Sequence, residues 1–203
     1  MKLYYAPAAC SLSPHIVLRE AGLPFEMEQV NLGDKTMAGG GDYRSINPKG
    51  YVPALRLDDG TVLTEGPAIV QYIADQVPDS QLAPPAGTLE RYQLIEWLNF
   101  ISTEIHKNMG GLFKPQLPDA TRSAIEETLA ARLGFVAQRL GAASYLSGER
   151  FSVADAYLFV ILNWAPFVKF DLSPWPALQA FHQRVAARPA VQAALRAEGL
   201  IKG

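Results

Sequence analysis

The sequence predicts a small α/β domain followed by an all-α domain. Residues 1–77 alternate short runs of β-forming residues with helical runs, a pattern typical of a small α/β unit. Residues 78–87 contain three prolines and no apolar periodicity, which predicts an interdomain linker. Over residues 88–203 the apolar positions recur at helical spacing, without a strand signal. We therefore expect this second domain to be a helical bundle.

The first half predicts the element order β-α-β-loop-β-β-α. Pro14 in the first turn of the first helix and Gly22 after its last turn are typical start and stop signals. The segment 58–61, Asp-Asp-Gly-Thr, is typical of the turn in a β-hairpin. The expected strands are 3–5, 25–30, 54–57 and 62–64, and the expected helices are 14–21 and 66–77.

Five further segments of the second half have helical spacing. They are 89–109, 120–140, 152–168, 177–187 and 190–197. Ser152 and Asp155 are spaced as in an N-terminal capping box, ahead of the apolar run 156–162. We interpret this box as a structural helix start and folding signal.

Composition and charge limit the classes of partner. A net charge of −2 gives no basic excess, so nucleic acid and anionic membranes have no electrostatic support as partners, and we expect a small ligand. One cysteine cannot close an intramolecular disulfide, which fits a reducing compartment. The first apolar run is too short for a signal peptide, and no stretch reaches the ~18–20 apolar residues of a membrane span. We expect a cytoplasmic protein with no nucleic-acid or membrane partner.

That one cysteine, Cys10, lies where the first strand gives way to the first helix. Unpaired N–H groups and the macrodipole at a helix N-terminus stabilise an anion. A thiol there can have its pKa lowered from about 8.5 toward neutral, which makes a nucleophile. The alternative is a small buried apolar residue, and position alone leaves both interpretations open.

Two other junctions could bind a ligand. Pro53 stands at the entry of a strand, and a cis Val52-Pro53 bond would aim the Val52 backbone groups outward, where an extended peptide could pair with them. Glu65 and Gly66 begin a helix, so a carboxylate and free N–H groups meet there, which suits a ligand with an amine and a carboxylate. Taken alone, capping of the helix is the favoured interpretation of Glu65.

In the helix predicted at 89–109, Asn99, Thr103 and His106 share one face. The apolar stripe on the other side consists of Leu94, Leu98, Ile101 and Ile105. The polar face could line a cleft or be an ordinary solvated surface. The aromatic residues of this half, such as Phe113, Tyr157, Trp164 and Phe167, more often form core. The three histidines of the chain, His15, His106 and His182, are scattered and form no cluster with carboxylates or cysteine, so no metal site of standard spacing is predicted.

Taken together, these motifs resemble the cytosolic glutathione transferases, and more narrowly their bacterial beta class. The resemblance runs essentially end to end, and the order and spacing of the motifs carry it. It implies a thioredoxin-like first domain, a helical-bundle second domain, a homodimer, and no cofactor beyond glutathione as cosubstrate. The motifs are Cys10, Lys35, residues 47–50 (Asn-Pro-Lys-Gly), residues 52–55, residues 63–69, residues 95–99, residues 103–107, and the capping box followed by residues 155–158.

The resemblance also implies roles for individual residues. Cys10 would contact the glutathione sulfur and could form a mixed disulfide with it, and the Val52 backbone before a cis Pro53 would pair with the cysteinyl moiety. Glu65 and the Gly66 N–H would hold the γ-glutamyl end, and Lys35 would face the glycyl carboxylate. The implied helical-domain contacts, some reaching a neighbouring subunit's site, are Asn99, Thr103, Glu104, Ile105 and His106. His106 and Lys107 would also border the electrophile pocket as catalytic residues.

Two departures from the family pattern change what is expected. Gly66 replaces a serine of many relatives, which removes a hydroxyl and one hydrogen bond worth about 1 kcal/mol. Ser13 stands where a second thiol would complete a C-x-x-C pair, so an intramolecular dithiol cycle is impossible, although monothiol exchange is possible.

The function expected from this resemblance is conjugation of glutathione to small hydrophobic electrophiles. Thiol exchange, peroxide reduction or dehalogenation through Cys10 are expected side activities. A monothiol reductase and a non-catalytic binding or regulatory protein on the same scaffold are the alternatives.

Overall fold

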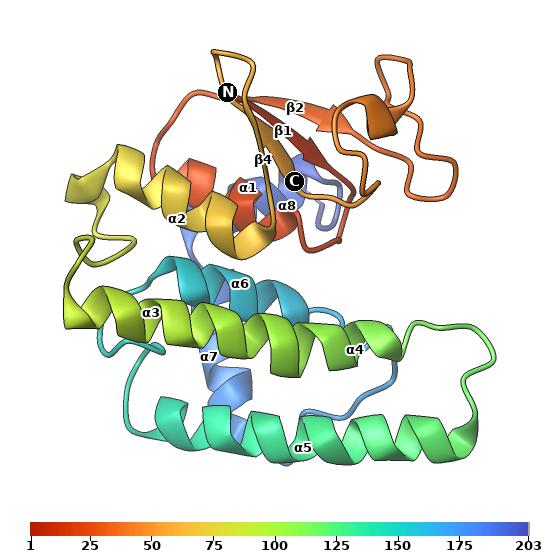
Figure 1. The fold of residues 1–203 in the computed structure, drawn as a ribbon. Coiled ribbons are helices and arrows are strands. Elements are labelled where there is room, and N and C mark those ends of the chain that lie inside the picture. Colours follow the sequence, from red (N-terminus) through yellow and green to blue (C-terminus); the bar gives the residue numbers. More distant parts are fainter. Residues whose placement is uncertain (203) are drawn as a thin grey trace. The chain divides into compact units, whose positions relative to one another are not determined.

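A computed structural model describes residues 1–202 of the chain (Figure 1). The residues group into two compact units. The first consists of Met1–Ala83 together with the C-terminal segment from Arg188 onward, and the second of Pro84–Ala187. Within the described residues, no helix is both long and apolar enough to cross a membrane.

The first unit is built on a four-stranded mixed sheet with the order β2-β1-β3-β4. β1 pairs in parallel with β2, with Leu3 opposite Met27, and antiparallel with β3, with Leu3 opposite Leu55. β3 and β4 form the predicted hairpin. The strands are β1 (Lys2–Tyr5), β2 (Glu26–Gln29), β3 (Ala54–Arg56) and β4 (Val62–Thr64).

Helices lie along one side of this sheet, as Figure 1 shows. α1 (Leu12–Glu20) packs against both α2 (Gly66–Gln76) and α8 (Pro189–Ala197). Strand residues alternate between the two faces. Leu3 and Leu55 are therefore fully buried, while their neighbours Tyr4 and Ala54 belong to a second apolar cluster with Val30, Tyr43 and Val52.

The predicted order of elements in this unit is confirmed. α1 begins at Leu12, earlier than the Pro14 expected from the proline signal, because Ser11 and not Ser13 is its N-cap. β2 is shorter than expected, because Val30 makes only an isolated bridge to Met37 after the last regular pair. A short 3₁₀ turn, η1 (Tyr43–Ser45), follows in the long loop, and a second, η2 (Pro78–Ser80), lies in the predicted linker.

α8 groups with the first unit, whereas the sequence predicted a helical domain over 88–203. Polar contacts accompany the packing of α8 on α1. The Arg188 guanidinium donates to both carboxylate oxygens of Glu20, at 2.6 and 2.8 Å, and His15 Nδ1 lies 2.8 Å from Glu198 Oε1. The amphipathic pattern of residues 190–197 predicts the helix α8, but it does not predict which surface the apolar face of α8 packs against.

The second unit is helical, as predicted. The expected helix 89–109 is present, but a π-helical turn interrupts its α-helical hydrogen bonding. The expected helix 152–168 is α-helical only as far as Leu162. The helical elements are α3 (Leu89–Phe100), the π-helical turn η3 (Ile101–His106), α4 (Lys107–Gly111), α5 (Asp119–Gly141), α6 (Val153–Leu162) and α7 (Pro176–Ala186).

α6 is the centre of this unit, because all of its residues are buried. Its capping box is confirmed. Asp155 Oδ2 accepts hydrogen bonds from the Ser152 N–H at 2.8 Å and the Ser152 hydroxyl at 2.7 Å, and its Oδ1 accepts from the Leu146 N–H at 2.9 Å. Burial raises the pKa of the Asp155 carboxyl to about 6. The box therefore ties the preceding loop to the start of α6.

Candidate functional site

Cys10 lies in the loop between β1 and α1, next to the strand that follows Pro53. Its Sγ donates a hydrogen bond to the Val52 carbonyl oxygen at 3.3 Å. The buried Ser11 hydroxyl closes this loop with two hydrogen bonds to Ala6. It accepts one from the Ala6 N–H at 3.1 Å and donates one to the Ala6 carbonyl at 3.2 Å. The sequence predicts that Cys10 and Val52 belong to one site, and the structure brings them into direct contact.

The electrostatic environment of Cys10 differs from the expected one. Burial raises the pKa of the thiol to about 11, and the nearby Glu65 carboxylate also raises this pKa. The N–H groups of Cys10 and Ser11 at the helix start lower it, but by less than burial raises it. In the free protein this balance favours the protonated thiol over the thiolate that the helix N-terminus alone would stabilise. The group presented at this position is a protonated thiol, which is a hydrogen-bond donor.

The Val52-Pro53 peptide bond is cis, the form considered from the sequence. The preceding turn is anchored in the apolar cluster of the first unit. The Tyr51 carbonyl accepts hydrogen bonds from the Tyr43 hydroxyl at 2.8 Å and the Asn47 side chain at 2.7 Å. Val52 is consequently held at the start of β3 with its carbonyl directed to the Cys10 sulfur.

Glu65 stands at the junction of β4 and α2 with a φ of 69°, and Gly66 is the first residue of α2. The Glu65 carboxylate is largely exposed and forms an ion pair with Lys49. The Lys49 ammonium also donates to the Thr64 hydroxyl at 2.8 Å. Glu65 is the N-cap residue of α2, as the favoured sequence interpretation expects, but its side chain makes no cap hydrogen bond and its carboxylate is turned to Lys49 instead.

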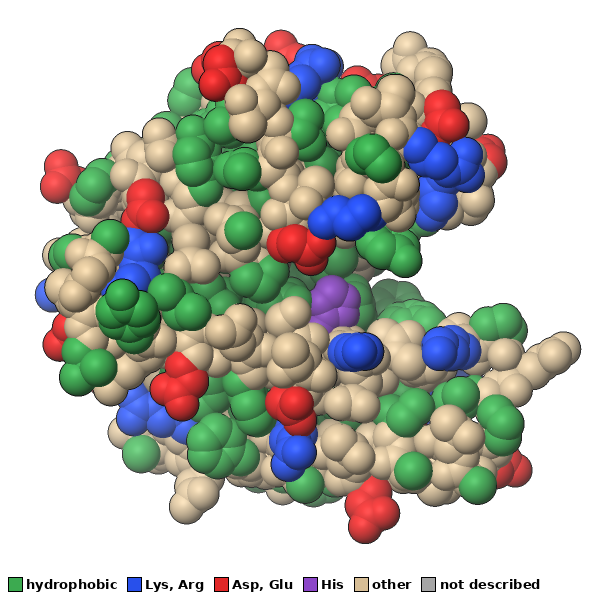
Figure 2. Space-filling view, in the orientation of Figure 1, with side chains coloured by type: hydrophobic (Ala, Val, Ile, Leu, Met, Phe, Trp, Pro, Cys, Tyr) green, Lys and Arg blue, Asp and Glu red, His purple; other side chains and the backbone are tan. Residues whose placement is uncertain are grey.

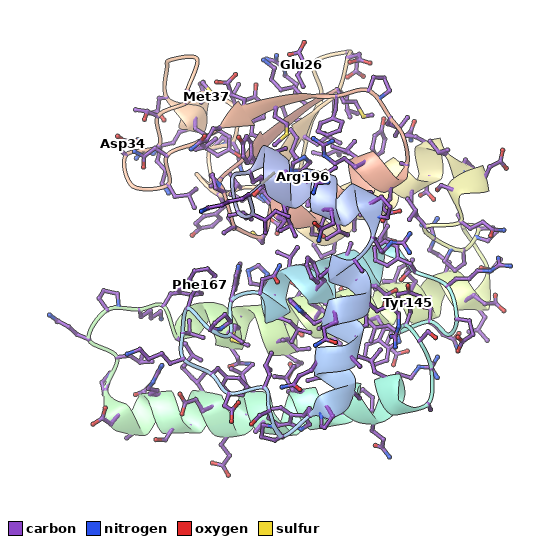
Figure 3. All side chains as sticks on the ribbon, turned by 180° about the vertical axis from the view of Figure 1, so that it is seen from behind. Glu26, Asp34, Met37, Tyr145, Phe167 and Arg196 are labelled. Carbon is purple, nitrogen blue, oxygen red and sulfur yellow. The ribbon has the colours of Figure 1, made fainter. Side chains whose placement is uncertain are left out.

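Lys35 comes from the long loop after β2, the part of the chain that Asp34 and Met37 mark in Figure 3. Its side chain runs alongside Gly50, where an added β-carbon would lie 3.5 Å from Lys35 Cε. The turn 47–50 therefore contacts both predicted charged residues, Lys35 through Gly50 and Glu65 through Lys49. Lys49 is the residue that sequence reasoning missed. Its turn was identified as a family motif, but a lysine at a turn gives no signal of which carboxylate it meets.

His106, the last residue of η3, lies in an aromatic cluster of the second unit. Its Nδ1 is 2.5 Å from the Tyr157 hydroxyl, and its ring meets the Trp164 ring edge-to-face at 4.9 Å. Phe113 contacts Trp164 in the same way at 5.7 Å. Burial lowers the pKa of His106 to about 4, so the imidazole is neutral at physiological pH. Tyr157 and Trp164 are buried as expected, whereas Phe113 and Phe167 are exposed.

The other ligand-contacting residues predicted from this helix differ in their exposure and in their partners. Asn99, Thr103 and Lys107 are exposed, and the Thr103 hydroxyl donates to the Asn99 carbonyl at 3.1 Å. Glu104 is paired with Arg132 of α5 at 2.8 Å. Ile105 is fully buried and its side chain belongs to the apolar core of the unit. Within residues 1–202, no group of three or more His, Cys, Asp or Glu side chains could hold a metal ion.

The first unit, with its mixed sheet and a cysteine before its first helix, has the thioredoxin-like fold expected above, and the second unit is the expected helical domain. Two family models match the chain. They describe the glutathione S-transferase N-terminal domain, over residues 9–76, and the glutathione S-transferase C-terminal domain, over residues 100–189.

Individual relatives are similar over nearly the whole chain. Glutathione S-transferase GstA of Escherichia coli O157:H7 is 50% identical over 200 residues, covering 98% of this chain and 100% of that protein. A solved ternary complex of BphK, a bacterial GST, is 62% identical with a TM-score of 0.97, covering 98% and 100% of the two chains. A bacterial beta class glutathione S-transferase of Sphingomonas chungbukensis is 48% identical with a TM-score of 0.95, covering 99% and 100%. The chain belongs to the glutathione S-transferase family, in its bacterial beta class. It is an enzyme that transfers glutathione.

Proposed function

We propose that the enzyme conjugates reduced glutathione to small hydrophobic electrophiles, with the glutathione sulfur held at Cys10. The observation that carries this proposal is the contact between Cys10 Sγ and the Val52 carbonyl. It places a thiol beside the backbone that precedes β3, where an extended peptide could pair with Val52. A tripeptide bound along Val52 would have its own sulfur close to Cys10.

The charged ends of glutathione have matching groups in the same unit. The exposed Glu65 carboxylate suits the α-ammonium of the γ-glutamyl residue, and the Gly66 N–H at the start of α2 suits its carboxylate. Lys35, held beside Gly50, supplies a cation for the glycyl carboxylate. The contacts proposed from the second unit are Asn99, Thr103, Glu104, His106 and the backbone of Ile105.

The raised pKa of Cys10 favours one division of labour between the two sulfurs. Because Cys10 is protonated near neutral pH, its single S–H can turn from the Val52 carbonyl to a glutathione thiolate and so stabilise that anion. The glutathione sulfur then attacks the electrophilic carbon, forming a carbon–sulfur bond while the leaving group departs with the bonding electron pair. The proton of the glutathione thiol is released to solvent. Cys10 itself forms no bond in this reaction.

The aromatic cluster around His106 suits an apolar, preferably aromatic, electrophile. Edge-to-face contacts already organise His106, Trp164 and Phe113, and the exposed Phe113 offers a further ring. Neutral His106 can form a hydrogen bond without adding charge, and the exposed Lys107 ammonium can stabilise negative charge on a leaving group.

We test this proposal by titrating reduced glutathione into the protein calorimetrically and measuring its intact mass without reductant. Binding in the micromolar to millimolar range is expected, and absence of binding would contradict the proposal. The variant Cys10→Ala is then assayed for conjugation to an aryl halide and for disulfide exchange. Conjugation should fall by about tenfold, the size of one hydrogen bond to a charged sulfur, and exchange should disappear. Complete loss of conjugation would instead show that Cys10 is essential for it, and disulfide exchange by the wild type without conjugation would favour the monothiol reductase.

We also propose that the enzyme is a homodimer, as the resemblance implies. Figure 2 shows hydrophobic side chains at the surface over α3 and α5. Phe135 of α5 is 54% exposed, although it stacks on Trp97 at 5.8 Å and meets Phe100 edge-to-face at 5.5 Å. Tyr92 and Leu89 of α3 are also largely exposed. Exposed aromatic and apolar side chains of this kind are enriched at protein interfaces.

A further inference from the structure

We propose that Lys49 competes with the α-ammonium group of glutathione for the Glu65 carboxylate and thereby limits the affinity of the enzyme for its substrate. The inference depends on the proposed role of Glu65 in binding the γ-glutamyl end. It assigns to Lys49 a part in substrate affinity that follows from the ion pair present in the free protein.

Lys49 forms an ion pair with the carboxylate that would bind the α-ammonium group of glutathione. Its ammonium is ion-paired with Glu65 Oε1 and donates a second hydrogen bond to Thr64 Oγ1 at 2.8 Å. The incoming group on glutathione is also a primary ammonium, with the same charge and the same donors. Because Glu65 attracts either cation equally by charge, the two must share or exchange the carboxylate, and two ammonium groups on one carboxylate repel each other.

Backbone hydrogen bonds fix the main chain at both residues of the Lys49–Glu65 ion pair. On the Lys49 side, Asn47 is buried. Its side-chain oxygen accepts a hydrogen bond from the Lys49 N–H at 3.2 Å, and its backbone carbonyl accepts one from the Gly50 N–H at 2.8 Å. On the other side, the Glu65 carbonyl accepts the N–H groups of Ala68 and Ile69, at 3.1 and 3.0 Å. Lys49 therefore meets Glu65 without a change in the backbone, and only its side chain has to move for an exchange.

The side chains themselves are free to exchange. The Lys49 side chain is 46% exposed and that of Glu65 is 69% exposed, so water can solvate the released ammonium. Exposed ion pairs of this kind are weak. Competition should therefore reduce the apparent affinity for glutathione by a modest factor, about two- to fivefold, because only the fraction of molecules with Glu65 unpaired is competent to bind.

The test is a calorimetric titration of the full-length enzyme with two ligands. The first is S-methylglutathione, which cannot form a disulfide with Cys10, and the second is its analogue in which hydrogen replaces the α-amino group. The variant is Lys49→Met, which keeps an unbranched side chain as far as Cε and removes the ammonium group. The matched control is Arg44→Gln, which removes the cation of another exposed ion pair in the same unit, Arg44–Asp42 at 3.1 Å.

We expect Lys49→Met to bind S-methylglutathione about two- to fivefold more tightly than the wild type, and to bind the analogue without the amino group with unchanged affinity. Arg44→Gln should change neither affinity. Unchanged or weaker binding of S-methylglutathione by Lys49→Met would overturn the proposal. Equal gains for both ligands would also overturn it, because the effect would then not involve the ammonium group.

Failure of this inference can be told apart from failure of the proposed function. If the wild type binds S-methylglutathione no better than the analogue, Glu65 does not recognise the ammonium and the proposed function of that residue is wrong. If the wild type prefers S-methylglutathione but Lys49→Met gains nothing, the assignment of Glu65 is retained and only the competition is refuted.

Discussion

At the scale of single residues, two opposing effects set the pKa of the Cys10 thiol: burial and a nearby carboxylate raise it, and the helix N-terminus lowers it. The N–H groups at the start of α1 favour a thiolate at Cys10, as the sequence suggests. The thiol is nevertheless partly buried and lies in the field of the Glu65 carboxylate, and both effects favour the protonated form. Their sum favours a protonated thiol, a hydrogen-bond donor, at this position of the free protein.

This environment predicts how Cys10 reacts with iodoacetamide. Since the folded pKa is about 11, compared with about 8.5 for a free thiol, alkylation of the native protein at pH 7 should be at least about 100-fold slower than alkylation of the unfolded chain. The rate should rise about tenfold for each pH unit between 7 and 10, because the thiolate fraction rises in that proportion. Mass spectrometry of timed samples measures the rate, and the urea-unfolded protein is the control. A rate that reaches a plateau below pH 8 would show a thiolate in the free enzyme.

At the scale of elements, α6 and the helix from α3 to α4 behave differently. α6 is specified by local signals, since its capping box and its apolar run predict both its start and its burial. The longer helix contains the π-helical turn η3, and the residues predicted to reach ligands from this helix, Thr103 to His106, lie in it. π-Helical turns occur frequently at functional sites. Apolar periodicity does not predict the turn, because Ile101 and Ile105 are buried in the π-helical arrangement as they would be in an α-helix.

The capping box predicts a large stability effect for Asp155→Ala. Three donors lose their acceptor, and the N–H groups of Ser152 and Leu146 become buried without a partner. We expect the free energy of unfolding to fall by about 3 kcal/mol, measured by urea denaturation.

Asp171→Ala is the matched control for this change. Asp171 accepts from the N–H and the hydroxyl of Ser173, at 2.8 and 2.6 Å, but it is exposed, so water replaces the lost acceptor. Its cost should stay below about 1 kcal/mol. Equal losses for the two variants would mean that burial of the box contributes nothing.

At the scale of the whole molecule, contacts made far apart in the sequence determine which parts belong together. The chain returns to the first unit after Ala187, and α8 packs on α1, where Arg188 and Glu198 meet Glu20 and His15. The exposed aromatic surface of α3 and α5 is left for a partner within the proposed dimer.

The dimer proposal predicts that Phe135→Glu dissociates the enzyme. A charge at the centre of the aromatic surface would have to be buried without a partner, which costs more than the remaining contacts can offset. Sedimentation velocity should show a shift from twice the chain mass to the chain mass. Phe167→Glu is the control, because Phe167 is 67% exposed but lies outside the aromatic surface of α3 and α5 (Figure 3). A dimer that survives Phe135→Glu would place the interface elsewhere.

By itself the sequence determined the order of elements, the position of Cys10 before α1, and the junctions at Val52 and Glu65. These features depend on short-range signals, namely apolar period, caps, prolines and turns, which act within a few residues of each other. Only the tertiary structure decided the direction of the Cys10 pKa, the pairing of Lys49 with Glu65, and the docking of α8 on α1. Each of these depends on which distant residues surround a group, because desolvation, charge and packing act through space and not along the chain.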